Sequence, residues 1–231
     1  MGSIFISGID TNIGKTIATG LLARFLLKRS CVITQKLVQT GCTDLSDDIG
    51  VHRRLMGCDL LEQDRKGLTC PYLFRHPSSP HLSASMEGRK IDTKHLREAT
   101  LALEKEFTTV LIEGAGGLMV PLNSRTMVLD HIMENQYPVV LVASPRLGSI
   151  NHTCLSIEAL RSRNIQLMGI IYNLFDQKDL LIAKDSMEQI RNFMVQNHYP
   201  GNIVVMDKID FSNPEDIDFN CFFPGLFDIY K

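Results

Sequence analysis

The sequence contains no tryptophan, and aromatic residues make up only 7% of its 231 residues. Proteins that hold single-stranded nucleic acid stack its bases on aromatic side chains, so this composition argues against such a platform. An excess of basic residues is also missing, because 24 Lys and Arg stand against 26 Asp and Glu. The resulting formal charge of −2 lacks the basic footprint of a dedicated nucleic-acid-binding protein. We therefore expect no nucleic acid among the partners of this chain.

None of the six cysteines forms a CxxC pair, which argues against a zinc ribbon and against a dithiol redox motif. Reduced thiols of this kind are typical of the cytoplasm. No apolar run approaches the roughly 18 residues that a membrane-spanning helix needs. The first residues lack the basic stretch and cleavage site of a signal peptide. These absences predict a cytoplasmic protein that does not interact with a membrane.

Short apolar runs alternate with helical patterns along the whole chain. Because the runs are nearly continuous in Val, Ile and Leu, they are typical of a parallel sheet covered on both faces. The expected strands are 3–9, 31–38, 108–113, 138–144, 167–173 and 202–207, and the expected helices are 16–30, 47–56, 93–107, 151–163 and 180–196. This alternation predicts a doubly wound α/β fold with ligands at the carboxyl ends of its strands.

Two further features concern domain organisation. The chain has no internal repeat and no linker-like segment, so we expect a single domain over residues 1–231. Residues 69–88 contain three prolines and are too long for a plain connection. Segments of this kind are usually functional or mobile, and we expect this one to be irregular.

A glycine-rich loop, GIDTNIGKT, follows the first strand and opens the first helix, from Gly8 to Thr16. The backbone N–H groups of such a loop, together with a helix N-terminus, bind polyphosphates. Lys15 would reach the β- and γ-phosphates, and the Thr16 hydroxyl would bind Mg²⁺. The usual pattern has four residues between the first glycine and GKT, whereas five stand here. The sequence therefore predicts a variant phosphate-binding loop.

A carboxylate and a lysine end two other strands. Glu113 closes an apolar strand and is followed by glycines, as expected for a second Mg²⁺ ligand beside a phosphate loop. These glycines do not form GxGxxG, because Met119 stands at the third glycine position. Lys36 ends the second strand, so it would project toward the phosphate loop. Downstream, Asp47 and Asp48 follow a helix-capping serine, and either acid could meet the metal.

Five segments together resemble the dethiobiotin synthetase family. They are GIDTNIGKT, KLVQTG at 36–41, SPH at 79–81, EGAGGLMVPL at 113–122 and LGSINH at 147–152, and their order and spacing agree over about residues 3–175. The resemblance implies a P-loop ligase of biotin biosynthesis that acts as a homodimer with Mg²⁺ and with ATP as co-substrate. Its substrate would be 7,8-diaminononanoate, which CO₂ converts to a carbamate. Phosphorylation of the carbamate and attack by the second amine would give dethiobiotin, ADP and phosphate.

The resemblance also implies roles for individual residues. Lys36, Lys15 and Thr11 would be catalytic, and Thr16, Asp48 and Glu113 would bind the metal. The nucleotide would contact Asn12, Ile13, Gly14, Lys15, Thr16, Ile17, Asp48, Glu113, Gly114, Ala115, Gly116 and Asn173. The substrate would contact Thr40, Gly116, Gly117, Val120, Pro121, Leu147, Gly148 and Asn151, with 147–152 reaching it across the dimer interface.

Some positions depart from the family pattern or are open. Leu37 replaces a proline that often follows the lysine, and of the two aspartates Asp48 is preferred because it begins the helix. No adenine-binding segment is evident beyond about residue 175, where Met206 and Asp207 are only guesses. The acidic tail after residue 211 suggests no function, and we expect it to be solvated or docked.

Two alternatives belong to the same fold. One is a related amidoligase or cobyrinic-acid enzyme, and the other is a partitioning or septum-positioning ATPase that switches partners. Such switches usually carry an additional lysine early in the loop, where Ile9 and Asp10 stand here. No histidine is placed as a general base, and His52, His81 and His152 have simple interpretations as packing or capping residues, which we favour for His52.

Overall fold

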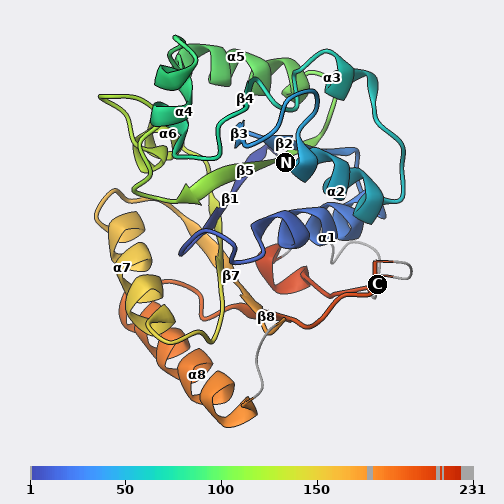
Figure 1. Ribbon diagram of the computed structural model, residues 1–231. Helices are drawn as coiled ribbons and strands as arrows, with labels where there is room; N and C mark the ends of the chain where they lie inside the picture. The colour runs from blue at the N-terminus through green and yellow to red at the C-terminus, as the bar shows by residue number, and fades with distance from the viewer. Residues whose placement is uncertain (1, 176–178, 212–213, 215, 225–231) are drawn as a thin grey trace.

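The computed structural model describes residues 2–175, 179–211, 214 and 216–224. Six parallel strands form its central sheet in the order β2-β5-β1-β6-β7-β8 (Figure 1). They are β1 (Ser3–Gly8), β2 (Val32–Lys36), β5 (Thr109–Gly117), β6 (Val139–Ala143), β7 (Leu167–Asn173) and β8 (Ile203–Met206). The predicted doubly wound α/β fold is confirmed, and each predicted strand of the sheet lies within a few residues of its expected position.

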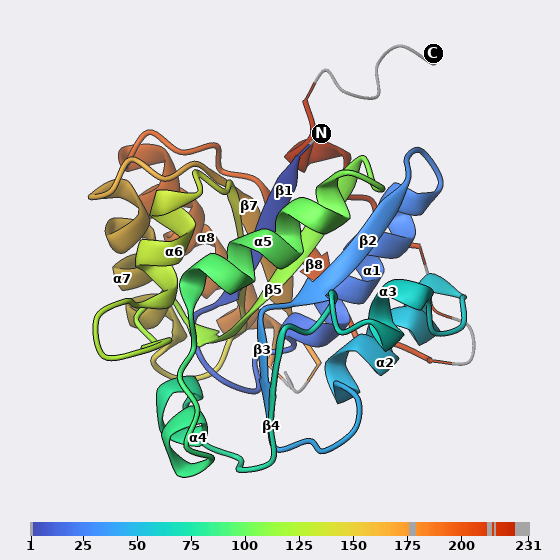
Figure 2. The same cartoon turned by 90° about the horizontal axis from the view of Figure 1, so that it is seen from above.

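Helices cover both faces of the sheet (Figures 1 and 2). On one face, α1 (Lys15–Leu27) and α2 (Asp47–Met56) share a core with the segment around Phe219. The other face packs against α5 (Thr93–Glu104), α6 (Val128–Glu134), α7 (Ser149–Arg161) and α8 (Leu180–Gln196).

Alternation of side chains along the strands produces these two cores. In β1, Ile4 and Ile6 belong to the core beside α1, while Phe5 belongs to the opposite one. Since Phe5 and Ile6 are both completely buried, each contributes roughly 1.5–3 kcal/mol to stability. Burial on two faces explains why the strands show continuous apolar runs.

The predicted strand 31–38 is wrong as a single element. It divides at Leu37, because the Lys36 N–H donates to Thr69 O and the Leu37 N–H donates to Glu113 O. The chain then continues as β3 (Val38–Thr40), which pairs in parallel with β4 (Tyr72–Phe74) in a separate two-stranded sheet.

Residues 69–88 are not irregular as expected, since they contain β4 and the helix α4 (Pro80–Met86). Pro80 occupies the first turn of α4, where its missing N–H costs nothing. Two more short elements, α3 (Glu62–Arg65) and the 3₁₀ turn η1 (Asn220–Phe222), and the helix α6 were not expected either. All are too short to show a helical or strand period.

The chain after residue 211 is docked where the structure describes it. Phe219 and Phe222 are buried beside α1, and the Phe219 ring meets the Phe25 ring edge-on at 5.5 Å between centroids. The acidic composition of this segment gave no indication that its aromatic residues would be buried. Across the described residues, no helix combines the length and the apolar character needed to cross a membrane.

Candidate active site

A cleft of about 760 Å³ lies at the carboxyl ends of β1, β2 and β5. Parallel sheets bind ligands at this edge because neighbouring connections diverge there. The loop before α1, the strand β3, the start of α2 and the segment before α4 complete its walls. Its lining comprises Thr11, Asn12, Ile13, Gly14, Lys15, Thr16, Ile17, Lys36, Val38, Gln39, Thr40, Asp48, Pro77, Ser78, Ser79, Pro80, Glu113, Ala115, Gly116 and Val120.

The loop between β1 and α1 wraps around the N-terminus of α1. Gly14 caps the helix with φ of +93°, a left-handed conformation that glycine adopts without steric cost. A Cβ at this position would lie 2.4 Å from Asn173 Nδ2, so a side chain here would have to displace the Asn173 amide. The helix therefore begins with its positive dipole end facing the cleft, which suits a phosphate group.

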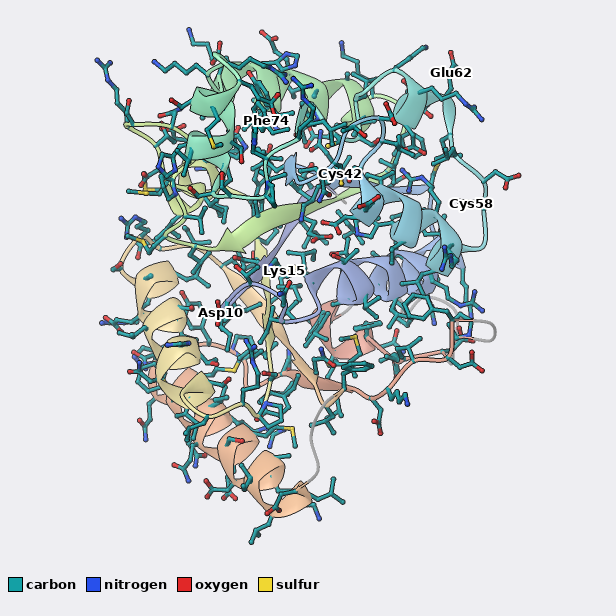
Figure 3. The ribbon with its side chains drawn as sticks, viewed as in Figure 1. Asp10, Lys15, Cys42, Cys58, Glu62 and Phe74 are labelled. Carbon is teal, nitrogen blue, oxygen red and sulfur yellow. The ribbon has the colours of Figure 1, made fainter. Side chains whose placement is uncertain are left out.

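Lys15 extends from the first position of α1 back over the loop. Its Nζ donates to the backbone oxygen of Asp10 at 2.8 Å, and Figure 3 labels both residues where β1 passes into α1. Burial, followed by repulsion from Lys36, lowers the pKa of Lys15 to about 8. Lys15 has no carboxylate within ion-pair distance in the described structure, so an incoming anion would be its first close counter-charge.

Lys36 lies on the other side of the cleft in a different environment. Its Nζ contacts Asp48 Oδ2 at 2.6 Å, Glu113 Oε1 at 2.8 Å and Gly114 O at 3.2 Å. Burial alone would lower the pKa of Lys36, but the two carboxylates outweigh it and raise the pKa well above its usual value. All three ammonium protons thus have acceptors, and the lysine stays charged.

Three side chains contact the Glu113 carboxylate at the end of a buried stretch of β5. Its Oε1 accepts from Lys36 and, at 3.1 Å, from the Thr16 hydroxyl, while its Oε2 lies 2.8 Å from His52 Nε2. Burial would raise the pKa of this carboxyl, but Lys36 and His52 hold it far below its usual range. A simple packing role for His52 is therefore incomplete, because its ring contacts the predicted metal ligand.

The structure distinguishes the two neighbouring aspartates. Asp48 lines the cleft and pairs with Lys36, whereas Asp47 Oδ2 accepts from the Cys42 thiol at 3.1 Å, outside the cleft. Ser46 caps α2 by accepting from the Ile49 N–H, as its position predicted. The first turn of α2 thus directs one carboxylate into the cleft and the other away from it.

Most of the remaining predicted residues border this cleft or a neighbouring cavity. Thr11, Thr40, Gly116 and Val120 line the cleft, as do Asn12, Ile13, Ile17 and Ala115. A second cavity of about 400 Å³ shares Thr11 and Val120 with it and adds Gly117, Met119 and His152. Pro121 forms an isolated backbone bridge with Met127, and Gly114 contributes its carbonyl to Lys36.

Three predicted substrate residues lie elsewhere. Gly148 caps α7, and Leu147 and Asn151 are exposed on either side of it. None of the three lines the cleft or the two neighbouring cavities. Within one copy of the described chain, the segment 147–151 is therefore not brought to the cleft.

Asn173 joins β7 to the phosphate loop. Its Nδ2 donates to Ile13 O at 3.0 Å, and its Oδ1 accepts from the Phe175 N–H. It borders a third cavity of about 200 Å³, with Arg146 and Phe175 among its walls. Of the two guesses for an adenine site, Met206 is buried beside the loop and Asp207 is exposed, and neither lines this cavity.

The wall formed by residues 77–80 was not predicted from the sequence. Pro77, Ser78, Ser79 and Pro80 line the cleft opposite the phosphate loop. The available signal was the SPH segment within a proline-rich stretch, which carried the family resemblance but suggested no contact. Because this wall forms where the chain folds back after β4, no local sequence pattern predicts it.

The fold is shared with other proteins of known structure. A family model described as an AAA domain matches residues 2–204. A chain of the MinC:MinD cell division complex from Aquifex aeolicus superposes with a TM-score of 0.54 over 90% of this chain and 82% of that one. At 13% identity this likeness shows the fold alone. The sheet, the phosphate loop and the paired lysines define an ATP-binding protein of the P-loop class.

Sequence similarity narrows the class further. The ATP-dependent dethiobiotin synthetase BioD 2 of Haemophilus influenzae is 53% identical over 182 residues, covering 78% of this chain and 95% of that protein. The ATP-dependent dethiobiotin synthetase BioD of Chlorobaculum tepidum is 52% identical over 186 residues, which are 80% of this chain and 78% of that protein. The chain belongs to the dethiobiotin synthetase family, as its sequence motifs predicted. The partitioning alternative shares only the fold.

Proposed function

We propose that this cleft carries out the reaction of the family with Lys15, Lys36 and Thr11 as its catalytic residues. The reaction is the ATP-dependent carboxylation and ring closure of 7,8-diaminononanoate to dethiobiotin. One amine adds to CO₂ and loses a proton, which gives a carbamate. A carbamate oxygen then attacks the γ-phosphorus of ATP and displaces ADP. The second amine finally attacks the carbamic carbon, and inorganic phosphate and a proton leave.

The observation that carries this proposal is the presence of two buried lysines in one cleft. Among the described residues Lys15 donates to a single backbone carbonyl, whereas Lys36 is bound by Asp48 and Glu113. Phosphoryl transfer requires positioning and neutralisation of charge on the transferred group, and two cations supply both. Partner-switching ATPases usually carry their additional lysine early in the loop, whereas Lys36 ends β2, so its position favours chemistry on an anionic acceptor.

The two lysines would serve different oxygens. Lys15, with the loop from Asn12 to Ile17, would bind the β- and γ-phosphates at the N-terminus of α1. Lys36 and Thr11 would face the carbamate and the phosphoryl group in transfer. A carbamate is a weak, charged nucleophile, so a cation beside it stabilises both its formation and the charge that accumulates during its attack.

Thr16, Asp48 and Glu113 would hold Mg²⁺. Their donors are one hydroxyl and two carboxylates, the hard oxygen ligands that this cation prefers. Among the described residues no cluster of three acidic, histidine or cysteine side chains could hold a metal alone. That fits Mg²⁺, which keeps several waters and shares its sites with substrate phosphates. When bound, the ion would neutralise charge on the phosphates of ATP.

The diamine would occupy the side of the cleft formed by Thr40, Gly116, Gly117, Val120 and Pro121. We propose that the chain acts as a homodimer in which a second copy supplies Leu147, Gly148 and Asn151. Their exposure in one copy fits such a role, and the N-terminus of α7 suits a substrate carboxylate. Asn173 would lie near the adenine. We further propose a single ligase domain in the cytoplasm without nucleic-acid partners.

Detection of the product tests the proposal directly. Purified protein is incubated with 7,8-diaminononanoate, bicarbonate, ATP and Mg²⁺, and dethiobiotin is measured by mass spectrometry. We expect product and ATP turnover together, and neither without the diamine or bicarbonate. ATP turnover that ignores the diamine and responds to DNA or lipid vesicles would instead favour a molecular switch and overturn the proposal.

A further inference from the structure

Behind Glu113, three buried polar side chains form a continuous hydrogen-bonded row. His52 Nε2 lies 2.8 Å from Glu113 Oε2, and His52 Nδ1 lies 3.0 Å from Thr34 Oγ1. Arg53 Nη1 donates to the same Thr34 oxygen at 2.9 Å. All of these residues are buried. The row runs from the metal-binding carboxylate through α2 and β2 to a guanidinium that lies outside the cleft.

The far end of the row has a fixed orientation. Arg53 makes two hydrogen bonds to Asp64, from Nε to Oδ2 and from Nη2 to Oδ1, each at 2.8 Å. Asp64 also accepts from the Leu61 N–H and the Thr69 hydroxyl. A paired guanidinium of this kind is planar and always protonated, so its Nη1 is a donor toward Thr34.

This arrangement determines where the protons lie. The ionised Glu113 carboxylate can only accept, so the proton between Glu113 Oε2 and His52 Nε2 lies on Nε2. In a neutral imidazole Nδ1 is then an acceptor, and the Thr34 hydroxyl, whose oxygen also accepts from Arg53, donates to it and favours this tautomer. His52 Nε2 therefore donates to Glu113 Oε2, which matches the acceptor character of the ionised carboxylate.

The consequence concerns the direction of the Glu113 carboxylate. Its Oε2 is taken by His52, while its Oε1 faces Thr16 and Lys36 on the cleft side. A carboxylate held at one oxygen presents the other in a fixed direction. Outer partners of metal ligands orient them in this manner and affect metal affinity.

We propose that His52 is a positioning residue that orients Glu113 toward the metal, with Thr34 setting its tautomer and Arg53 orienting Thr34. The inference rests on the proposed metal role of Glu113. It assigns His52 no contact with substrate and no transfer of a proton. A purely structural role would require only that the row be buried and hydrogen-bonded.

Metal binding measured apart from turnover distinguishes the two roles. Mn²⁺, which replaces Mg²⁺ and has an electron paramagnetic resonance signal when free, is titrated into the protein–ADP complex. We expect His52→Leu to weaken Mn²⁺ binding about 10- to 100-fold. His52→Gln retains an N–H donor near the position of Nε2 and should recover binding to within a few-fold of wild type.

His131 offers a matched control outside the site. It is also completely buried, in α6, and its Nε2 has no hydrogen-bond partner among the described residues. His131→Leu removes a buried imidazole that does not contact Glu113. We expect it to leave Mn²⁺ affinity unchanged, whatever its effect on the melting temperature.

A second pair of variants protects the test against misfolding of His52→Leu. Thr34→Val keeps the shape but deletes the hydroxyl, so the His52 tautomer is no longer set, and we expect Mn²⁺ binding about tenfold weaker. Thr34→Ser keeps the hydroxyl and should bind as wild type does. Wild-type affinity in folded His52→Leu or Thr34→Val, or no recovery in His52→Gln, would overturn the inference. If wild type forms dethiobiotin normally in that case, only the positioning role fails and the proposed function stands.

Discussion

Each side of the cleft contains a buried lysine, and the surroundings of the two lysines differ in opposite directions. On the loop side, Lys15 donates to one backbone carbonyl, and burial lowers its pKa to about 8. On the β2–α2 side, Lys36 is surrounded by two carboxylates that raise its pKa. On the loop side, the Lys15 ammonium group can therefore pair with an anion that binds from solution. On the β2–α2 side, the two carboxylates neutralise the charge of Lys36 and hold its ammonium group in place. This suits a reaction that needs a cation at a fixed position.

This difference predicts that the two sides contribute differently to stability. Replacing Arg53 by Met leaves Asp64 buried without its cation, which should lower the free energy of unfolding by about 3–5 kcal/mol. Denaturant titration measures the loss. The double variant Arg53→Met/Asp64→Leu removes both charges and should recover much of it. Arg161→Ala, which breaks the exposed pair with Glu158, should cause a far smaller loss.

A loss below about 1 kcal/mol for Arg53→Met would contradict the view that buried, paired charges build the β2–α2 side. Equal losses for Arg53→Met and Arg161→Ala would do the same.

On the loop side, a substitution should affect activity strongly and stability little. Lys15→Ala removes the cation of the phosphate loop, and product formation should fall about 100- to 1,000-fold. Because Lys15 is buried and no carboxylate in the described part of the chain forms an ion pair with it, its loss should leave the free energy of unfolding unchanged or higher. Rates of dethiobiotin formation and denaturant titration measure the two effects. Lys94→Ala, an exposed lysine in α5, is the matched control.

A variant at Lys15 that keeps more than a tenth of the wild-type rate would exclude it from the phosphate site.

A smaller effect is expected at the proposed metal site, where the two sides of the cleft meet. Glu113→Gln preserves shape but replaces a charged ligand with a neutral one, so half-saturating Mg²⁺ should rise about tenfold or more. The measurement is a Mg²⁺ titration of product formation, with the exposed Glu98→Gln as control. An unchanged titration would remove Glu113 from the metal site.

The sheet was predictable because burial on both faces leaves long apolar runs in the sequence. The short elements were not, since β3 and β4 exist through their pairing with each other, 34 residues apart, and α6 spans only two turns. A three-residue strand carries no period of its own. Tertiary contacts, and not local preference, define these elements.

The candidate site likewise contains residues that the sequence predicts and contacts that it does not. The loop from Gly8 to Thr16 is contiguous, and Lys36 and Glu113 could be brought together by the rule that parallel strands share their carboxyl edge. The His52 contact depends on how α2 packs against β2, which no spacing reveals. Leu147 remains a prediction, because its expected role involves a second copy of the chain.

One measurement tests the difference between the two lysines most directly. Lys36→Gln is compared with wild type in single-turnover formation of dethiobiotin and, separately, in ADP titration, after denaturant titration has established that the variant is folded. If Lys36 stabilises the carbamate and the phosphoryl group in transfer, the single-turnover rate should fall about 100-fold or more, with ADP affinity changed much less. A near-normal rate, or a loss confined to ADP affinity, would contradict the account.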